Sequence, residues 1–314
     1  MRARGFRAGA QMNAFWFGVI LLLSLSAIIA IYNFCVSWAM EKAITRSKRN
    51  PATGILHGAE PIFFQGSNGK ACLLVHGFIG SPTDFGRLPL LLHKRGYTVS
   101  VPLLPGHGTD PKDFSKTTPE QLISAVQENY AWLKKNYGQV SLVGLSLGAT
   151  LNLVVAAKLN VDTLVLLAPY LKIKHQWFYL FPAEWYHAAL SPFIPYVYRL
   201  PYFKQVFRRE ALSGIVDYDF VSTRGVTTTL RVGRMAQTVV ENLKAPTLII
   251  HSKKDRATDY QASLRLCQRL KGDSRFITLE RSNHIILWDY EAEAVENEII
   301  NFIEKFVATE ASHG

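Results

Sequence analysis

The sequence predicts an α/β protein: a mostly parallel β-sheet with helices on both faces, preceded by an apolar N-terminal helix. Three observations predict it. Short apolar runs alternate with amphipathic segments from about residue 60 onward. A serine flanked by glycines, in the pattern Gly-x-Ser-x-Gly at 144–148, stands between one such run and a small-residue segment. Residues 15–38 form an almost wholly apolar stretch.

The N-terminal segment, residues 1–45, is predicted to carry a transmembrane helix at about 15–38. These 24 residues would span roughly 36 Å as a helix, which is enough to cross a hydrocarbon core of about 30 Å. Aromatic residues lie toward both ends of the stretch, as interface anchors do. The alternative is a signal peptide cleaved before Met40, where small residues stand at the right positions. The apolar run is longer than that of a typical signal peptide, which favours the anchor.

The anchor predicts a single-pass membrane protein, with the bacterial inner membrane as the expected location. Its orientation stays open, because Lys and Arg residues flank the stretch on both sides in similar number. Residues 46–59 contain Pro and Gly but little periodicity, so we expect them to form a tether. The folded domain should then occupy 60–314.

The elements of this domain follow in order, each predicted from its own pattern. Apolar runs predict strands at 61–65, 70–76, 97–102, 139–143, 163–168, 247–251 and 275–279. Longer segments predict helices at 82–95, 119–136, 149–159, 260–270 and 291–307. The helix at 119–136 starts with a capping box and has proline at its first position.

Residues 170–244 interrupt this alternation, and we expect them to form a cap over the carboxyl edge of the sheet. Residues 170–207 hold thirteen aromatic residues in 38 positions, together with several prolines. An ordinary connection in such a fold has only about 2–6 residues. The alternative is an aromatic packing subdomain without a role at the site.

Positive charge is concentrated in two parts of the chain. Residues 1–50 carry a net charge of +6 and residues 170–209 carry +5, which account for the whole net charge of +11. The basic character therefore belongs to the membrane flanks and the cap, and no nucleic-acid-binding face is indicated. We expect an anionic lipid surface as a partner. The sequence leaves the oligomeric state open.

The glycine-flanked Ser146 has the pattern of a nucleophile elbow. A serine hydroxyl needs a base to take its proton, and the base needs a third group to orient it. Asp255 and His284 follow Ser146 in the order that this architecture requires, each shortly after a predicted strand. Asp259 is a rival for the acid, and His251, inside a predicted strand, is a weaker alternative for the base.

An oxyanion hole needs two backbone donors beside the nucleophile. Leu147, the residue after the serine, is expected to supply one, and Phe78, in the loop after the 70–76 strand, the other. No metal or organic cofactor is implied. The three cysteines have neither an even disulfide framework nor the spacing of metal ligands.

Five stretches together resemble the α/β-hydrolase superfamily, and more narrowly bacterial carboxylesterases and monoacylglycerol lipases. They are HGFIGSP at 76–82, PLLPGHGT at 102–109, GLSLGA at 144–149, HSKKD at 251–255 and SNHIILWD at 282–289. The resemblance covers about residues 70–307. It implies a triad of Ser146, Asp255 and His284, with Phe78 and Leu147 as oxyanion donors. The anchor and the aromatic, basic cap depart from that pattern, so the resemblance implies less about the substrate than about the fold and the triad.

The sequence therefore predicts a membrane-anchored serine ester hydrolase for lipid-like acyl esters, with monoacylglycerols or lysolipids as leading candidates. A thioesterase or acyltransferase with the same triad is an alternative. A non-catalytic ligand receptor or membrane scaffold on the same fold is the alternative outside enzymes. Epoxide hydrolases and dehalogenases are disfavoured because they carry a carboxylate at the elbow. A peptidase is disfavoured because Glu184 is the only acid in 170–209 that could hold a substrate amine.

Overall fold

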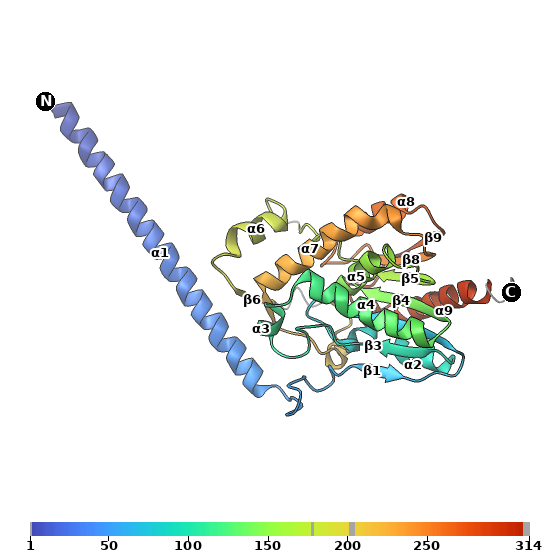
Figure 1. Cartoon of the computed structure of the whole chain (residues 1–314). Helices are drawn as coiled ribbons and strands as arrows, with labels where there is room; N and C mark the ends of the chain where they lie inside the picture. Colours follow the sequence, from blue (N-terminus) through green and yellow to red (C-terminus); the bar gives the residue numbers. More distant parts are fainter. Residues whose placement is uncertain (1, 177–178, 201–204, 310–314) are drawn as a thin grey trace.

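The computed structural model describes residues 2–176, 179–200 and 205–309, and Figure 1 shows an α/β domain from which one long helix projects. Seven strands form the central sheet: β1 (Ile62–Phe64), β2 (Lys70–Val75), β3 (Thr98–Val101), β4 (Gln139–Leu145), β5 (Thr163–Leu167), β8 (Thr247–Ser252) and β9 (Ser274–Leu279). Their order is β1-β3-β2-β4-β5-β8-β9. β1 pairs antiparallel with β3, and the other neighbours pair parallel. The predicted mostly parallel sheet is confirmed.

The register of the central strands brings their carboxyl ends to one edge. Gly144 of β4 lies opposite Val75 of β2, and Leu145 lies opposite Leu167 of β5. At the far side, Ser252 of β8 lies opposite Leu279 of β9. The loops that follow β2, β4, β8 and β9 therefore emerge along the same edge, where an open parallel sheet binds its ligands.

Helices cover both faces of the sheet. One face carries α4 (Pro119–Asn136), α5 (Leu147–Ala156), α7 (Thr223–Val239) and α8 (Tyr260–Arg269), and the other carries α2 (Leu88–Lys94) and α9 (Ala292–Thr309). The alternation of side chains along each strand sets this division. Leu73 and Leu142 pack against the first group, and their neighbours Cys72 and Val143 against the second. The predicted capping box at the start of α4 is present.

The helix predicted at 82–95 is two elements. A 3₁₀ helix, η1 (Pro82–Phe85), ends at Gly86, and α2 begins at Leu88. Gly86 adopts a φ of 52°, and a Cβ there would lie 3.1 Å from the carbonyl oxygen of Leu287. The chain turns sharply at this glycine, so one continuous helix is not possible.

The segment that stands outside the two helical layers is 170–222, which is shorter than the predicted cap at 170–244. Its described elements are α6 (Ala183–Leu190), β6 (Tyr196–Tyr198), η3 (Arg209–Gly214) and β7 (Phe220–Ser222), with β6 and β7 paired antiparallel. Residues 177, 178 and 201–204 of the predicted cap lie outside the described residues. α7, by contrast, packs on α5, and its Val232 and Ala236 belong to the main core. α7 is therefore a layer helix rather than part of the cap.

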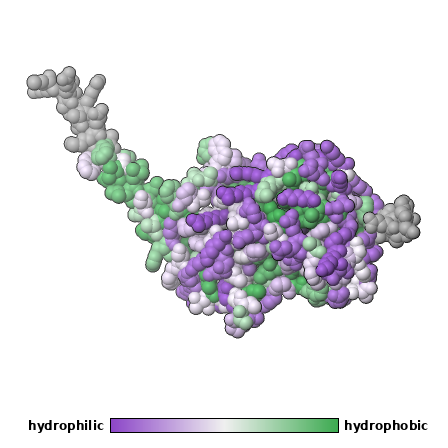
Figure 2. Space-filling model, in the orientation of Figure 1, coloured by the Kyte–Doolittle hydropathy of each residue, from purple (hydrophilic) through white to green (hydrophobic). Residues whose placement is uncertain are grey.

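The N-terminal helix α1 (Arg2–Arg46) extends beyond the predicted 15–38 anchor at both ends. Within the described residues, Phe15–Arg46 is the one helical stretch long and apolar enough to cross a membrane, and little of it is buried against the rest of the chain. Figure 2 shows it as a largely green rod leaving a domain whose visible face is mostly purple. A signal sequence would look the same by these criteria.

The last turns of α1 pack on the cap. Val36 and Met40 are buried in a small cluster with Phe220 of β7. Asn33 Nδ2 donates a hydrogen bond to the carbonyl oxygen of Phe193 at 2.9 Å. The helix is thus in contact with the 170–222 segment, and Figure 1 shows the lower half of α1 running beside β6.

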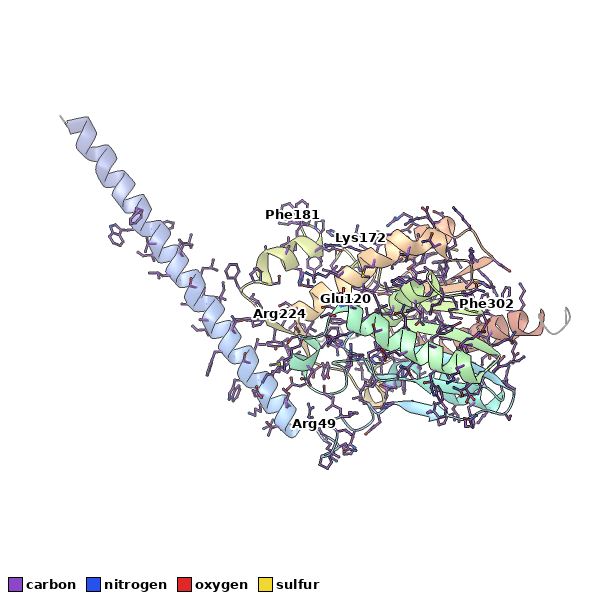
Figure 3. The ribbon with its side chains drawn as sticks, in the orientation of Figure 1. Arg49, Glu120, Lys172, Phe181, Arg224 and Phe302 are labelled. Carbon is purple, nitrogen blue, oxygen red and sulfur yellow. The ribbon has the colours of Figure 1, made fainter. Side chains whose placement is uncertain are left out.

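The segment predicted as a tether, 46–59, is folded onto the domain. An antiparallel bridge joins Arg49 to Leu56, and Arg49 Nη1 donates to the carbonyl oxygen of Thr109 at 2.6 Å. Glu41, near the end of α1, forms an ion pair with Lys112 of the short helix α3 (Pro111–Phe114). Figure 3 shows Arg49 where α1 meets the domain. These contacts attach both the end of α1 and the 46–59 segment that follows it to the domain.

Candidate active site

Ser146 occupies the tight turn between β4 and α5. Its φ of 55° and ψ of −115° belong to a region that residues with side chains rarely adopt. Strand and helix touch at this turn. A Cβ on Gly144 would lie 2.5 Å from the backbone of Ala149, and one on Gly148 would lie 1.9 Å from the carbonyl oxygen of Val75. The two glycines are therefore required, and the local geometry is that of a nucleophile elbow.

Asp255 and His284 form a buried pair at the same edge of the sheet. His284 Nδ1 lies 2.7 Å from Asp255 Oδ2, and each residue is 2% exposed. Asp255 follows β8, and His284 follows the neighbouring β9. The rival acid Asp259 is the N-cap of α8, where its Oδ1 accepts the N–H of Ala262 at 2.7 Å. The geometry therefore favours Asp255 as the partner of the histidine.

The Asp255 carboxylate accepts five hydrogen bonds. Oδ1 accepts the backbone N–H groups of Ala257 and Thr258, at 2.7 and 2.9 Å. Oδ2 accepts from His284, from Thr258 Oγ1 at 2.9 Å and from His251 Nε2 at 3.0 Å. Burial alone would raise the pKa of Asp255, but the interactions with the two histidines outweigh it and hold that pKa well below its usual range. The carboxylate is ionised at neutral pH.

An ionised carboxylate can only accept hydrogen bonds, so His284 must carry its proton on Nδ1. Its Nε2 is then available to take a proton from Ser146. In the part of the chain that the structure describes, no hydrogen bond joins Ser146 Oγ to His284. Such contacts are often long in unliganded enzymes and shorten when substrate binds.

His251, the weaker alternative for the base, lies behind the acid. It is fully buried, and both of its ring nitrogens are engaged, with Ser263 Oγ at 2.7 Å and with Asp255 Oδ2 at 3.0 Å. A ring bonded through both nitrogens has none left to receive a proton from Ser146. His251 therefore supports the carboxylate of Asp255.

The expected oxyanion donors lie on two loops that meet at the elbow. Leu147 is the first residue of α5, so its N–H has no acceptor within the helix. Phe78 lies in the loop after β2, next to Gly77, where a Cβ would be 3.3 Å from Ser146 Cβ. The following residue, Ile79, has a φ of 56°. Such strain at a loop that touches Ser146 is typical of a functional site.

Asp84 supports this loop from its interior side, and the sequence analysis did not single it out. Its Oδ2 accepts the N–H of Gly77 at 3.0 Å. Gly80 has no room for a side chain, because a Cβ there would lie 2.1 Å from the same oxygen. Burial raises the pKa of Asp84 to about 7, against the opposing effect of the hydrogen bond from Gly77. The carboxyl group is therefore an uncommonly basic one beside the expected oxyanion hole.

His76 connects the same loop to the 102–109 stretch. Its Nδ1 donates to the carbonyl oxygen of Gly77, and its Nε2 accepts the N–H of Leu104, each at 3.0 Å. Burial, helped by the nearby His107, lowers the pKa of His76 well below its usual value. The ring stays neutral, as this pair of bonds requires. The first two motifs of the resemblance thus form one structural unit.

Asp289 fastens the loop of His284 to the cap. Its Oδ2 accepts the N–H of Asn283 at 2.7 Å and that of Phe207 at 2.9 Å. In addition, the carbonyl oxygen of Gln205 accepts the N–H of His284 at 3.1 Å. The backbone of the histidine is therefore held from two sides. The sequence signal is an aspartate five residues after His284 at the end of SNHIILWD.

A cavity of about 400 Å³ lies between the cap and these loops. Phe78, in the loop after β2, and Asn283, next to His284 in the chain, line it. The aliphatic side chains among the other lining residues are those of Ile79, Ile173, Val197, Leu200, Val221, Val226 and Ala257. Such a cavity suits a hydrocarbon chain. Within the described residues, no group of three His, Cys, Asp or Glu side chains could hold a metal ion.

Comparisons with known proteins find ester hydrolases. The profile described as "Alpha/beta hydrolase family" matches residues 72–298. A thermostable monoacylglycerol lipase of Bacillus sp. (strain H-257) is 44% identical over 103 residues, which are 32% of this chain and 40% of the lipase. A carboxylesterase of Bacillus subtilis (strain 168) is 24% identical over 248 residues, 78% of this chain and 96% of the esterase. The solved structure of a metagenome-derived lipolytic enzyme gives a TM-score of 0.72 at 23% identity, covering 80% of this chain and 99% of that one.

Proposed function

Because the chain belongs to the α/β-hydrolase family, we propose that it is a membrane-anchored serine hydrolase of lipid-like acyl esters, such as monoacylglycerols or lysolipids. The observation that carries the proposal is the strained Ser146 at the same sheet edge as a buried His284 paired with Asp255. Both curated relatives described above, a monoacylglycerol lipase and a carboxylesterase, are carboxylic ester hydrolases.

The proposed reaction has two halves. Ser146 Oγ attacks the ester carbonyl while His284 Nε2 takes its proton, and the N–H groups of Phe78 and Leu147 stabilise the oxyanion. His284 then gives the proton to the departing alcohol, which leaves the acyl group on Ser146. In the second half, His284 deprotonates a water molecule that attacks the acyl carbon. The bond from that carbon to Ser146 Oγ breaks, His284 returns the proton to Ser146 Oγ, and the carboxylic acid leaves. Asp255 holds the imidazole in place and stabilises its charged form in both halves.

The membrane part of the proposal is supported by the surface of the cap. α6 buries none of its side chains, although many of them are apolar. The cap residues that are large, apolar and more than half exposed include Leu180, Phe181, Trp185 and Phe193. Figure 3 shows Phe181 at the outer side of α6. A patch of this kind next to a docked apolar helix suits a lipid surface. The exposed cations Arg208 and Arg209 add an attraction to anionic lipid.

Covalent labelling by a fluorophosphonate tests the catalytic part. Full-length protein in a neutral detergent should be labelled, and Ser146→Ala should lose labelling and nearly all turnover of p-nitrophenyl esters. Ser124→Ala, a change on the exposed face of α4, is the matched control and should retain both. Full activity in Ser146→Ala would overturn the proposal, and a wild-type protein that is neither labelled nor active would favour a receptor or scaffold. A panel that includes thioesters and acceptor alcohols separates hydrolysis from the thioesterase and acyltransferase alternatives.

Fractionation tests the anchor. Full-length protein with an intact N-terminus should stay with the membrane after a carbonate wash. A mature N-terminus at Met40, determined by mass spectrometry, would show instead that the apolar helix is a signal peptide. The packing of Val36 and Met40 on Phe220 supports the uncleaved form, because cleavage before Met40 would remove Val36 from that cluster.

A further inference from the structure

The cavity beside the catalytic loops is lined by basic side chains without acidic ones. Lys174, Arg199 and Arg256 line it, and no Asp or Glu does so among the described residues. Lys174 and Arg199 belong to the cap, and Arg256 directly follows the proposed catalytic acid. Charges of a single sign in a cleft with apolar walls concentrate the electric field and attract the opposite charge. The cavity therefore favours an anion.

Arg199 has hydrogen-bond donors that the protein does not use. The residue follows β6 and is only 7% exposed. Its Nη2 donates to Asp217 Oδ2 at 2.5 Å and lies 4.0 Å from Asp219 Oδ1. Its Nε and Nη1 are buried and have no hydrogen-bond partner in the described part of the chain. A guanidinium has five N–H donors, and a buried donor without an acceptor is destabilising. A ligand that brings acceptor oxygens would relieve this.

Lys174 supplies a second charge from the opposite part of the cap. It is half-buried, and its backbone N–H donates to the carbonyl oxygen of Ala257 at 3.0 Å, which fixes the residue beside the loop of the proposed acid. Its ammonium group forms no ion pair or hydrogen bond with any residue that the structure describes. Lys172, two residues earlier, is exposed and does not line the cavity. The two lysines thus form a natural pair for comparison.

We propose that this cavity binds an anionic group, a carboxylate or a phosphate, carried by the ester substrate, with Arg199 and Lys174 as its cationic contacts. Guanidinium groups donate to carboxylate and phosphate oxygens, and an ammonium group adds a point charge. The inference rests on the proposed function and narrows its substrate class. The preferred substrate joins a hydrocarbon chain, which the apolar walls accept, to a negative charge. A lysophospholipid or a half-ester of a dicarboxylic acid meets this description, whereas a monoacylglycerol is neutral.

The test compares esters that differ in one anionic group. Full-length protein in neutral detergent micelles is assayed with p-nitrophenyl hexanoate against the p-nitrophenyl half-ester of adipic acid, and with a monoacylglycerol against the lysophosphatidic acid of the same chain. Neutral micelles remove any effect of an anionic surface. We expect kcat/KM to favour the charged member by about tenfold or more, which is the discrimination that one charge-assisted contact provides. Equal kcat/KM for both members of each pair would overturn the inference.

Variants test whether the preference for the charged ester comes from the cavity. Lys174→Gln should lower this preference about tenfold, mainly through KM for the charged ester, and leave the neutral ester nearly unchanged. Lys172→Gln should leave both esters unchanged, and an equal loss in the two variants would overturn the assignment to the cavity. Arg199→Lys is the second variant and keeps a cation for Asp217. Its thermal unfolding is measured beside its kinetics, so that loss of folding is distinguished from loss of selectivity.

Inorganic phosphate distinguishes a substrate group from a free anion. Competitive inhibition by phosphate against the charged ester, weaker in Lys174→Gln, supports the proposal. Stimulation of neutral-ester turnover by phosphate would mean that the site holds a free anion, and the proposed substrate class would be wrong. If no ester of either kind is hydrolysed, the proposed function itself fails. If neutral esters are hydrolysed through Ser146 without preference for charge, only the inference about the cavity fails.

Discussion

Replacing Asp255 by Asn changes the most heavily bonded carboxylate of the site. Its Oδ1 accepts two backbone N–H groups, so we expect the amide oxygen of the variant to take this position. The amide NH₂ then faces His284 Nδ1, which now donates to Oδ2. Two N–H groups cannot point at one another, so His284 must move its proton to Nε2. In that tautomer it cannot accept the proton of Ser146.

The expected size of the effect follows from this loss. Removing the orienting carboxylate while keeping its shape lowers kcat about 10⁴-fold in a serine hydrolase, or about 5.4 kcal/mol at the transition state. Asp259→Asn is the matched control. Asp259 caps α8 by accepting the N–H of Ala262, and Asn is an equally good capping residue. That variant should retain kcat within a factor of about three, since the capping strength of the two residues is similar.

The assay is kcat toward p-nitrophenyl butyrate at pH 8 for the wild type and both variants, with thermal unfolding recorded for each. A folded Asp255→Asn variant that keeps a tenth or more of the wild-type kcat would show that Asp255 does not orient the histidine. A collapse of kcat in Asp259→Asn alone would show that the acid lies four residues further along the chain.

Two further substitutions test the packing of the loop after β2 and of the turn at Ser146. Burial raises the pKa of Asp84 from 3.8 to about 7, so the folded state retains this proton and the wild type should lose stability as pH rises from about 4 to about 7, by at most about 4 kcal/mol. The melting temperature of Asp84→Asn should not fall over this pH range. If the melting temperatures of the wild type and of Asp84→Asn change with pH in parallel, the raised pKa of Asp84 is contradicted. Gly148→Ala puts a Cβ 1.9 Å from the carbonyl oxygen of Val75 and should abolish soluble folded protein, whereas Gly138→Ala has nothing within 4 Å of its Cβ and should fold normally. Similar yields of folded protein for the two variants would contradict the close approach of Gly148 to Val75.

The features that could be predicted from the sequence depend on residues close together in the chain. The elbow needs only Ser146 and the glycines two residues to either side, because the steric conflict lies within one strand–turn–helix unit. The capping box of α4 is a four-residue pattern, and the strands are continuous apolar runs. The pairing of Asp255 with His284 required the parallel order of the sheet as well, which the alternation of elements supplied.

The features that were missed depend on contacts that no local pattern records. Asp84 is buried against two glycines of the preceding loop. The sequence alone does not distinguish a buried aspartate from an exposed one. The predicted cap extends to 244 because the alternation of strands and helices resumes only at 247, and α7 falls inside it, although its Val232 and Ala236 belong to the main core. The fold of 46–59 on the 102–109 stretch depends on a hydrogen bond from Arg49 to Thr109, sixty residues away.

The packing of α1 on the cap affects how the rate should be described. Since Val36, Met40 and Asn33 hold the helix against the cap, an enzyme anchored by α1 cannot swing freely away from the bilayer. For the proposed hydrolase of lipid-like esters, the search for substrate is then confined to two dimensions, and the quantity that sets the rate is the mole fraction of substrate among the surrounding lipids. Diluting a vesicle suspension with buffer should leave turnover per enzyme unchanged, whereas diluting the substrate with inert lipid should lower it in proportion.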